Sequence, residues 1–227
     1  MEAFTLILYG FPGSGKGTQG KLIKEKFNVN YLASGDVVRE IMQSNDELGK
    51  LVKDRYNKGI PQPDDVIVEI FKKKMELVLI DSKNKKFVID GFPKSINQAI
   101  ELDNLSKKLF LKSPFFIYLE VPENVVIDRI SNRLFCTNCG ISYLPTQDEY
   151  KKEICSRCGD KLSKRIDDEP ETVKVRLQKE KIIISNLLKY YQKKERLITI
   201  NGNQSIDYVH KDIVNKLKIN GMINDEY

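Results

Sequence analysis

The residues best suited to chemistry near the start of the chain form a glycine-rich segment, residues 10–18, with the sequence GFPGSGKGT. Glycines let consecutive backbone N–H groups turn toward one anion, whose approach a side chain would block. A helix beginning at Lys16 would add the positive end of its dipole, and the lysine adds a point charge for the β- and γ-phosphates of a nucleotide. A glycine-rich turn without a ligand is the alternative. The expected donor-nucleotide residues are Gly13, Ser14, Gly15, Lys16, Gly17 and Thr18.

A second candidate is Asp90, which ends an apolar run and is followed by the sequence GFPK. A carboxylate at the end of a buried strand beside a phosphate loop commonly holds Mg²⁺ directly or through water. We expect Thr18 to take part in the same magnesium site. A helix-capping role for Asp90 is the alternative, and Pro93 counts against it. Lys94 and Gln98 lie four positions apart, so both could project from one edge of the following helix.

Ser34, Asp36 and Arg39 form a third group. A serine and an early aspartate are typical of the start of a helix, where they stabilise unpaired N–H groups and the dipole. Such a cap explains Ser34 and Asp36 but does not explain Arg39, which lies about one turn into the helix on an otherwise apolar face. Arg39 is either a surface residue with its stem along apolar side chains or a ligand of a phosphate group.

Four arginines flank a cysteine-rich segment, two before it and two after it. Arg129 and Arg133 are four positions apart on an expected helix and repel each other unless an anion lies between them. A phosphoryl group in transfer spreads its charge over its oxygens, and proteins stabilise it with converging arginine forks, a lysine and Mg²⁺. The expected catalytic residues are Lys16, Arg129, Arg133, Arg165 and Arg176.

The cysteine-rich segment has the spacing of a metal site. Cys136 and Cys139 form one C-x-x-C pair, Cys155 and Cys158 form another, and fifteen residues separate the pairs. This pattern is typical of a four-thiolate tetrahedral Zn²⁺ site, although disulfides are the alternative. Because four thiolates leave no coordination position open, we expect a structural and not a catalytic metal.

The elements that would position these residues are short apolar runs that alternate with helical patterns. The runs lie at 4–9, 31–33, 87–89, 115–121 and 197–200. This alternation predicts an α/β fold with a parallel sheet and helices on both faces, and ligands in such sheets lie beyond the carboxyl ends of the strands. Segments 34–64 and 135–168 do not have the pattern of the core. We expect them to be insertions that move as lids.

Composition agrees with a globular protein of this size. The chain has 227 residues, 41% of them hydrophobic and 31% charged, which is enough for one sizeable core with an inserted subdomain. The net charge of +6 suits a polyanionic partner, either nucleotides or a nucleic acid. No apolar stretch is long enough to cross a bilayer, and the first strand starts too early for a presequence. We expect an intracellular protein, cytoplasmic or mitochondrial, without a membrane partner.

Together these motifs resemble those of the adenylate kinase family, in the type with a long zinc-bearing lid, and the resemblance covers almost the whole chain. It rests on residues 10–18, the sequence SGDxxR that ends at Arg39, the sequence DGFP that begins at Asp90, Gln98, and the arginines and cysteines above. It also rests on the sequence RxDDxxET that begins at Arg165.

The resemblance implies a P-loop NTPase-like core with a five-stranded parallel sheet, formed by residues 1–33, 65–134 and 169–227. It also implies an acceptor-binding insertion at 34–64 and a zinc-bearing lid at 135–168. The implied reaction is Mg·ATP plus AMP giving two ADP. We also expect a monomer that binds no nucleic acid. Arg129 would contact the donor. The AMP residues would be Ser34, Arg39, Lys94, Gln98, Arg165 and Arg176.

Two positions and one segment depart from the family pattern. Lys94 stands where the family has an arginine, and a lysine keeps the charge but loses the bidentate fork. Ser34 stands where ATP-using members usually have threonine, and serine resembles the GTP:AMP phosphotransferases. The lid interior, residues 144–152, lacks the expected FNPP sequence. A GTP donor therefore remains an alternative to ATP. A UMP/CMP kinase and a zinc-ribbon nucleic-acid-binding protein are further alternatives.

Overall fold

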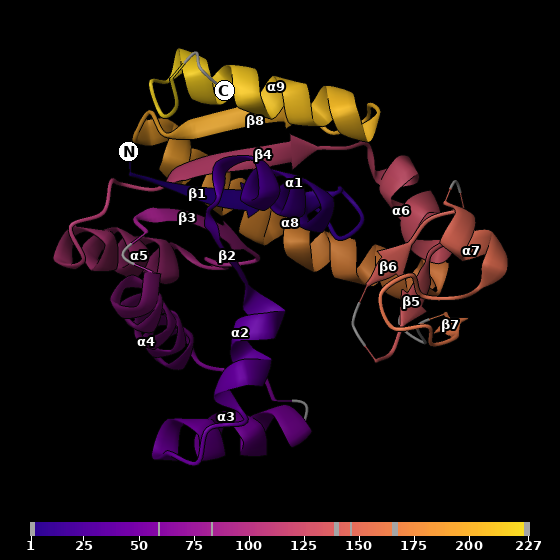
Figure 1. The fold of residues 1–227 in the computed structure, drawn as a ribbon, viewed down its shortest axis with the longest axis horizontal. Coiled ribbons are helices and arrows are strands. Elements are labelled where there is room, and N and C mark those ends of the chain that lie inside the picture. The colour runs from indigo at the N-terminus through magenta and orange to yellow at the C-terminus, as the bar shows by residue number, and fades with distance from the viewer. Residues whose placement is uncertain are drawn as a thin grey trace.

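The computed structural model describes residues 3–58, 60–82, 84–138, 141–145, 147–164 and 168–224. A five-stranded parallel sheet forms the centre, in the order β2–β3–β1–β4–β8 (Figure 1). Its strands are β1 (Phe4–Tyr9), β2 (Asn30–Ala33), β3 (Lys86–Asp90), β4 (Phe115–Glu120) and β8 (Leu197–Asn201). Each of the five predicted apolar runs is one of these strands, so the predicted α/β fold is confirmed.

Helices cover both faces of the sheet, which is why its strands are nearly continuous apolar runs. Leu6 and Leu8 of β1 pack with α1 (Lys16–Phe27) and α9 (Ile206–Ile219) on one face. Ile7 and Tyr9 join the core of the other face. The long helices of that face are α4 (Asp64–Ser82), α5 (Ile96–Lys108) and α8 (Pro170–Lys193). The carboxyl ends of the strands are thereby held in a rigid layer.

Two helices extend away from the sheet after β2 (Figure 1). They are α2 (Ser34–Ile41) and α3 (Glu47–Asn57). The side chain of Asp46 caps α3 by accepting a hydrogen bond from the Gly49 N–H at 2.9 Å. Val37 of α2 and Val52 of α3 belong to the same hydrophobic core as the face of the sheet that α8 covers, so both helices are packed onto that core.

A small module projects beyond α6 (Glu123–Ser131), at the right of Figure 1. It contains an antiparallel three-stranded sheet in the order β6–β5–β7, and a short helix, α7 (Asp148–Lys152). Its strands are β5 (Leu134–Cys136), β6 (Ser142–Tyr143) and β7 (Leu162–Ser163). Residues 134–163 are called the cysteine module below. Among the described residues, five buried side chains form its core: Leu134, Cys136, Tyr143, Cys155 and Leu162.

A buried charge cluster joins α5, α8 and β8 far from the glycine loop. Asp103 accepts hydrogen bonds from both terminal nitrogens of Arg196 at 2.8 and 2.7 Å and from the Tyr190 hydroxyl at 2.9 Å. Lys194 lies 3.3 Å from the same carboxylate. Because a buried carboxylate without partners would be costly, this set of donors stabilises the junction.

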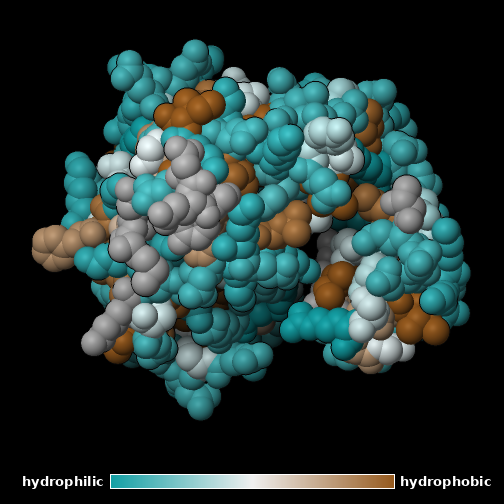
Figure 2. All heavy atoms as spheres, turned by 45° about the horizontal axis from the view of Figure 1, so that its top comes forward, coloured by the Kyte–Doolittle hydropathy of each residue, from teal (hydrophilic) through white to brown (hydrophobic). Residues whose placement is uncertain are grey.

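The surface shown in Figure 2 is mainly hydrophilic, with isolated hydrophobic side chains and a hollow beside the lobe at the right. Within the described ranges, no helix combines the length and apolar character that a membrane span requires.

Candidate active site

The glycine loop lies between the end of β1 and the start of α1, as the sequence predicts. Gly13 and Gly15 have positive φ angles of 81° and 98°, which glycine adopts without steric cost. The Lys16 ammonium donates hydrogen bonds to the carbonyl oxygens of Gly10 and Phe11, at 2.8 and 2.9 Å. The Lys16 ammonium is therefore held beside the glycine loop, where an anion bound by the loop would contact it.

Opposing effects act on the Lys16 ammonium. Burial lowers the pKa of Lys16, the carboxylates of Asp90 and Glu180 raise it, and the cations Lys94 and Arg133 lower it again, with a net lowering. A phosphate group beside this lysine would stabilise its charged form. The electrostatics of the site therefore favour an anionic ligand.

A cavity of about 440 Å³, called the loop cavity, opens against the glycine loop. Thr18 and Asp90 both line it, and Asp90 accepts a hydrogen bond from the Tyr31 hydroxyl at 2.8 Å. Asp90 does not cap α5, since Ser95 does so. A hydroxyl and a carboxylate on one cavity wall are the hard oxygen ligands that Mg²⁺ prefers, so these residues fit a magnesium ion. Other charged residues of the wall are Lys16, Lys21, Asp36, Arg39, Arg129, Arg133 and Arg157.

Arg129 and Arg133 both reach the loop cavity, but they have different partners. The Arg129 guanidinium lies 3.4 and 3.5 Å from the Gly202 carbonyl oxygen. Arg133 follows the end of α6 and makes two hydrogen bonds to Asp168, whose carboxylate also lies 3.8 Å from Arg176. Sequence reasoning missed Asp168 as the partner of both arginines. Arg165 lies outside the described residues.

A second cavity of about 430 Å³, called the α2 cavity, lies between α2 and the β3–α5 connection. The predicted residues Ser34, Arg39, Lys94 and Gln98 all line it. Arg39 also lines the loop cavity, so one guanidinium borders both spaces. In this structure it pairs with Asp36 at 2.5 Å, with both side chains more than half exposed.

The predicted placement of Lys94 on a helix edge is wrong. Helix α5 begins at Ile96, after the Ser95 side chain accepts a hydrogen bond from the Gln98 N–H. Lys94 therefore precedes the helix, and its own N–H donates to the Gln98 side-chain oxygen at 2.7 Å. The Gln98 amide nitrogen donates to Asp64 at 2.6 Å. Gln98 thus borders the cavity with its amide already held by two neighbours.

A third cavity of about 590 Å³, called the α9 cavity, lies between the glycine loop and the start of α9. Five of the residues predicted to bind the donor nucleotide line this cavity, namely Gly13, Ser14, Gly15, Thr18 and Arg129, but sequence reasoning did not predict its other wall. That wall includes Gly202, Gln204, Ser205, Ile206, Val209, Leu144 and Pro145. The only signal in the sequence is that residues 202–205 follow a strand at its carboxyl end, where ligands of parallel sheets bind.

The cysteine module brings three of the four predicted thiols together. The sulfur atoms of Cys136, Cys155 and Cys158 lie within 4.8 Å of one another, and those of Cys136 and Cys158 are 3.4 Å apart. Sulfurs around a tetrahedral Zn²⁺ with bonds of about 2.3 Å are about 3.8 Å apart, so these thiols fit zinc. The Tyr143 hydroxyl lies 3.3 Å from the Cys155 sulfur. Cys139 lies outside the described residues.

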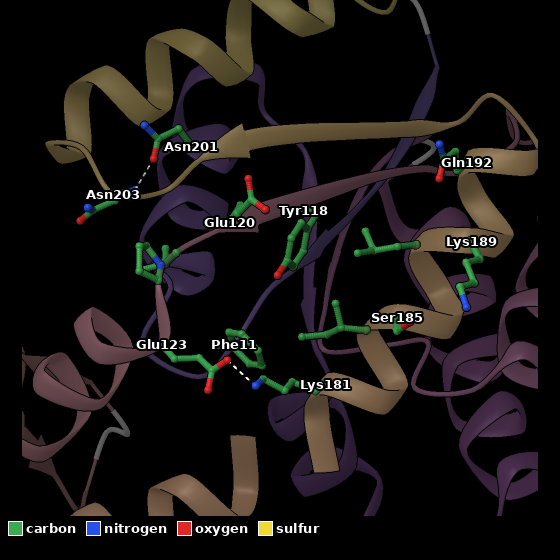
Figure 3. A pocket seen from close by; sticks show the side chains of 14 residues that line it. Phe11, Tyr118, Glu120, Glu123, Lys181, Ser185, Lys189, Gln192, Asn201 and Asn203 are labelled. Atoms are coloured by element: carbon green, nitrogen blue, oxygen red, sulfur yellow. Dashed lines mark hydrogen bonds and ion pairs between the residues drawn. The ribbon is translucent and has the colours of Figure 1, made fainter. Parts of the chain in front are cut away.

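A larger cavity of about 730 Å³, called the α8 cavity, lies between α8 and the carboxyl ends of β4 and β8 (Figure 3). Its floor includes the rings of Phe11 and Tyr118, and Lys181 of α8 points toward Glu123. Glu123 at the start of α6 pairs with Lys181 of α8 at 2.5 Å. None of the predicted site residues lines this cavity.

Comparison with known proteins gives a consistent result. The family model described as adenylate kinase matches residues 8–196. The adenylate kinase of Oceanobacillus iheyensis is 38% identical over 209 residues, which cover 92% of this chain and 96% of the relative. That of Petrotoga mobilis is 35% identical over 214 residues, covering 94% and 97%. That of Acetivibrio thermocellus is 37% identical over 213 residues, covering 93% and 97%. This chain therefore belongs to the adenylate kinase family of nucleoside monophosphate kinases and is a phosphotransferase.

Proposed function

We propose that the chain transfers the γ-phosphoryl group of Mg·ATP to AMP, giving two ADP. The observation that carries this proposal is the order of three cavities. Arg129 lines both the α9 cavity and the loop cavity, and Arg39 lines both the loop cavity and the α2 cavity. The donor base, the phosphate chain and the acceptor nucleoside need three adjoining cavities in this order.

The donor would lie in the α9 and loop cavities. Its base would occupy the apolar space beside Ile206 and Val209, and its phosphates would meet the glycine loop. Gln19 supports this placement, because its amide donates to the Ile206 carbonyl at 2.9 Å while its own oxygen is buried without a hydrogen-bond partner among the described residues. The N–H groups of residues 13–18 and the Lys16 ammonium would hold the β- and γ-phosphates.

Thr18 and Asp90 would hold Mg²⁺, directly or through water, in the loop cavity. When bound, the ion would offset the negative charge that develops on the phosphoryl group during transfer. The Tyr31 hydroxyl would keep the Asp90 carboxylate oriented toward this position through its hydrogen bond.

The acceptor would lie in the α2 cavity. Ser34 and Gln98 would contact the AMP base, and Arg39 and Lys94 would bind its phosphate, with Arg165 and Arg176 completing that set. The attacking oxygen of the AMP phosphate needs no general base, because it is already ionised at neutral pH and phosphoryl transfer depends mainly on positioning and charge stabilisation. Arg129 and Arg133, which also line the loop cavity, would supply much of that stabilisation.

Movement of two insertions would complete the site. Residues 34–64 would close over the acceptor, and residues 135–168 would close over the donor as a lid, against a core of 1–33, 65–134 and 169–227. Closure would exclude water from the donor phosphates. A structural Zn²⁺ held by Cys136, Cys139, Cys155 and Cys158 would stabilise the lid without touching substrate.

The experiment is a comparison of nucleotide pairs with purified full-length chain. ADP formation from AMP would be measured by chromatography with Mg·ATP and Mg·GTP in parallel, and UMP and CMP would replace AMP in matched reactions. We expect AMP to exceed both pyrimidine acceptors in kcat/KM by at least a hundredfold. No ADP formation from AMP with either donor, or faster transfer to UMP or CMP, would overturn the proposal.

The same experiment decides the donor base. We propose ATP as the main donor, whereas Ser34 favours GTP through its resemblance to GTP:AMP phosphotransferases. Ser34 lines the α2 cavity and not the α9 cavity, so it faces the acceptor side. A tenfold ratio of kcat/KM between the donors corresponds to about 1.4 kcal/mol, which one or two hydrogen bonds to a base edge supply.

A further inference from the structure

Glu180 lies where three elements meet beside the phosphate-binding residues, and neither the predicted site nor the proposed function gives it a role. Its carboxylate is 3.6 Å from the Lys94 ammonium, which precedes α5, and accepts a hydrogen bond from the Tyr9 hydroxyl of β1 at 3.5 Å. Glu180 itself belongs to α8. These contacts join residues that are far apart in the sequence.

The carboxylate is held in place from the core side. Tyr9 is buried, and burial together with the charge of Glu180 raises the pKa of its hydroxyl well above the ordinary value. Tyr9 therefore stays protonated at neutral pH and remains a hydrogen-bond donor to Glu180. The Glu180 side chain is itself only 22% exposed, so solvent screens its charge incompletely.

The charge of Glu180 reaches both lysines of the candidate site. It raises the pKa of Lys16, which holds the glycine loop, and it pairs with Lys94, which lines the α2 cavity. Lys94 is 51% exposed and has a flexible stem, so its ammonium can exchange one anionic partner for another. An arginine would bind the same carboxylate through a bidentate fork and exchange less readily.

We propose that Glu180 is a positioning residue that acts as the resting counter-ion of Lys94 and is displaced by the phosphate of the acceptor nucleotide. This inference rests on the proposed function, because it takes the α2 cavity as the acceptor site. The phosphate must compete with Glu180 for Lys94. Glu180 therefore weakens acceptor binding without contacting the donor.

The first test is Glu180→Gln, which removes the charge and keeps the shape. We expect the KM for AMP to fall at least threefold, with the donor KM changed by less than twofold and the melting temperature nearly unchanged. The matched control is Glu69→Gln, because Glu69 forms an exposed lysine–glutamate pair with Lys72 away from the cavities. An unchanged or raised KM for AMP in Glu180→Gln would overturn the proposal.

The second test shows whether Glu180 acts through Lys94. In a Lys94→Met background, adding Glu180→Gln should change the KM for AMP by much less than it does in the wild type. An equal change in both backgrounds would mean that Glu180 acts directly on the nucleotide, and the positioning role would be wrong. If the wild-type chain forms ADP from AMP but the two substitutions, Glu180→Gln and Lys94→Met, act independently on the KM for AMP, only this inference is refuted. Absence of ADP formation by the wild type would refute the proposed function and this inference with it.

Discussion

Arg133 and Asp168 form a two-point contact, with Nε 2.6 Å and Nη2 2.7 Å from the two carboxylate oxygens, although the residues are 35 positions apart. Their side chains are only 12% and 4% exposed. Asp168 precedes α8 and Arg133 precedes β5, so the contact joins the two chain segments that connect the cysteine module to the rest of the molecule. The orientation of the Arg133 guanidinium is thus fixed before any substrate binds.

This contact predicts the effect of Arg133→Lys. A lysine keeps the charge, but it loses the planar fork and cannot bind both Asp168 oxygens and a phosphoryl oxygen in the same geometry. We expect kcat to fall by about tenfold to a hundredfold, with little change in the KM for AMP. Steady-state kinetics with both substrates varied would measure it. A kcat within twofold of the wild type would place Arg133 outside the catalytic set.

Lys16→Ala tests the glycine loop. The lysine contacts two loop carbonyls and lines the loop cavity, so its removal would take away the cation that we propose to hold the donor phosphates. We expect kcat to fall on the order of a thousandfold. The melting temperature should change by only a few degrees, since the side chain is not part of the hydrophobic core. Retention of more than a tenth of the activity would remove Lys16 from the phosphate site.

Lys94→Ala tests the acceptor side. Because Lys94 lines the α2 cavity and not the α9 cavity, its loss should raise the KM for AMP by about tenfold and the donor KM by less than twofold. Initial rates at saturating donor would give the first value, and rates at saturating AMP the second. Equal increases for both nucleotides would show that Lys94 does not belong to the acceptor site.

The cysteine module predicts a metal that stabilises and does not react. We expect about one Zn²⁺ per chain, measured by elemental analysis, and thiols that resist alkylation until the protein is denatured or treated with a strong chelator. Cys155→Ser combined with Cys158→Ser should unfold the module at lower temperature while the parallel sheet stays folded. Activity should then fall in part at low temperature and steeply on warming. Loss of activity on metal removal, with the module demonstrably folded, would assign the ion to the chemistry.

Asp103→Asn tests stability far from the site. Burial works against ionisation of Asp103, but the hydrogen bonds from Arg196 and Tyr190 outweigh it, so the pKa of Asp103 is lowered. Removing its charge takes away the anionic partner of Arg196, and we expect a loss of about 3 kcal/mol, or roughly 6–12 °C in Tm. The exposed pair of Asp54 and Lys58 supplies the control, and Asp54→Asn should cost less than about 1 kcal/mol.

The difference in unfolding free energy between the wild type and Asp103→Asn should depend on pH in a defined direction. The folded pKa lies below the unfolded value of about 3.9, so the stabilisation is fully present above that value and is lost as the pH falls through the folded pKa. The unfolding free energies of the wild type and of Asp103→Asn should therefore become more similar as the pH falls into the acid range. A constant difference from neutral pH down to strong acid would show that the charge of Asp103 does not stabilise the fold.

The sequence predicts the parallel sheet and the position of the glycine loop well, because both depend on short-range sequence patterns. Each strand of the parallel sheet is an apolar run buried on both faces, and the glycine loop follows β1 directly. The error at Lys94 also has a local cause. Ser95 and Gln98 have the spacing of a helix-capping pair, in which the serine oxygen accepts from the N–H three residues later, and this signal places the helix start after Lys94.

Contacts across the sheet could not be predicted in the same way. Tyr9 and Glu180 are 171 positions apart, and nothing in either local pattern indicates their meeting. The wall of the α9 cavity is similar, since residues 202–206 have no unusual composition and are brought to the glycine loop only by the position of β8 next to β4. Such sites depend on strand order, which short-range patterns do not determine.

The small core of the cysteine module has a consequence for how fast its amide hydrogens exchange with solvent. Within the described residues, five buried side chains support it, two of them cysteines, whereas the sheet is covered by helices on both faces. Opening of the module exposes little apolar surface, so its amides should exchange through local opening long before those of β1 and β4. The exchange rate of the Leu134 and Leu162 amides would then report the opening of this module alone, while those of β1 and β4 report global unfolding.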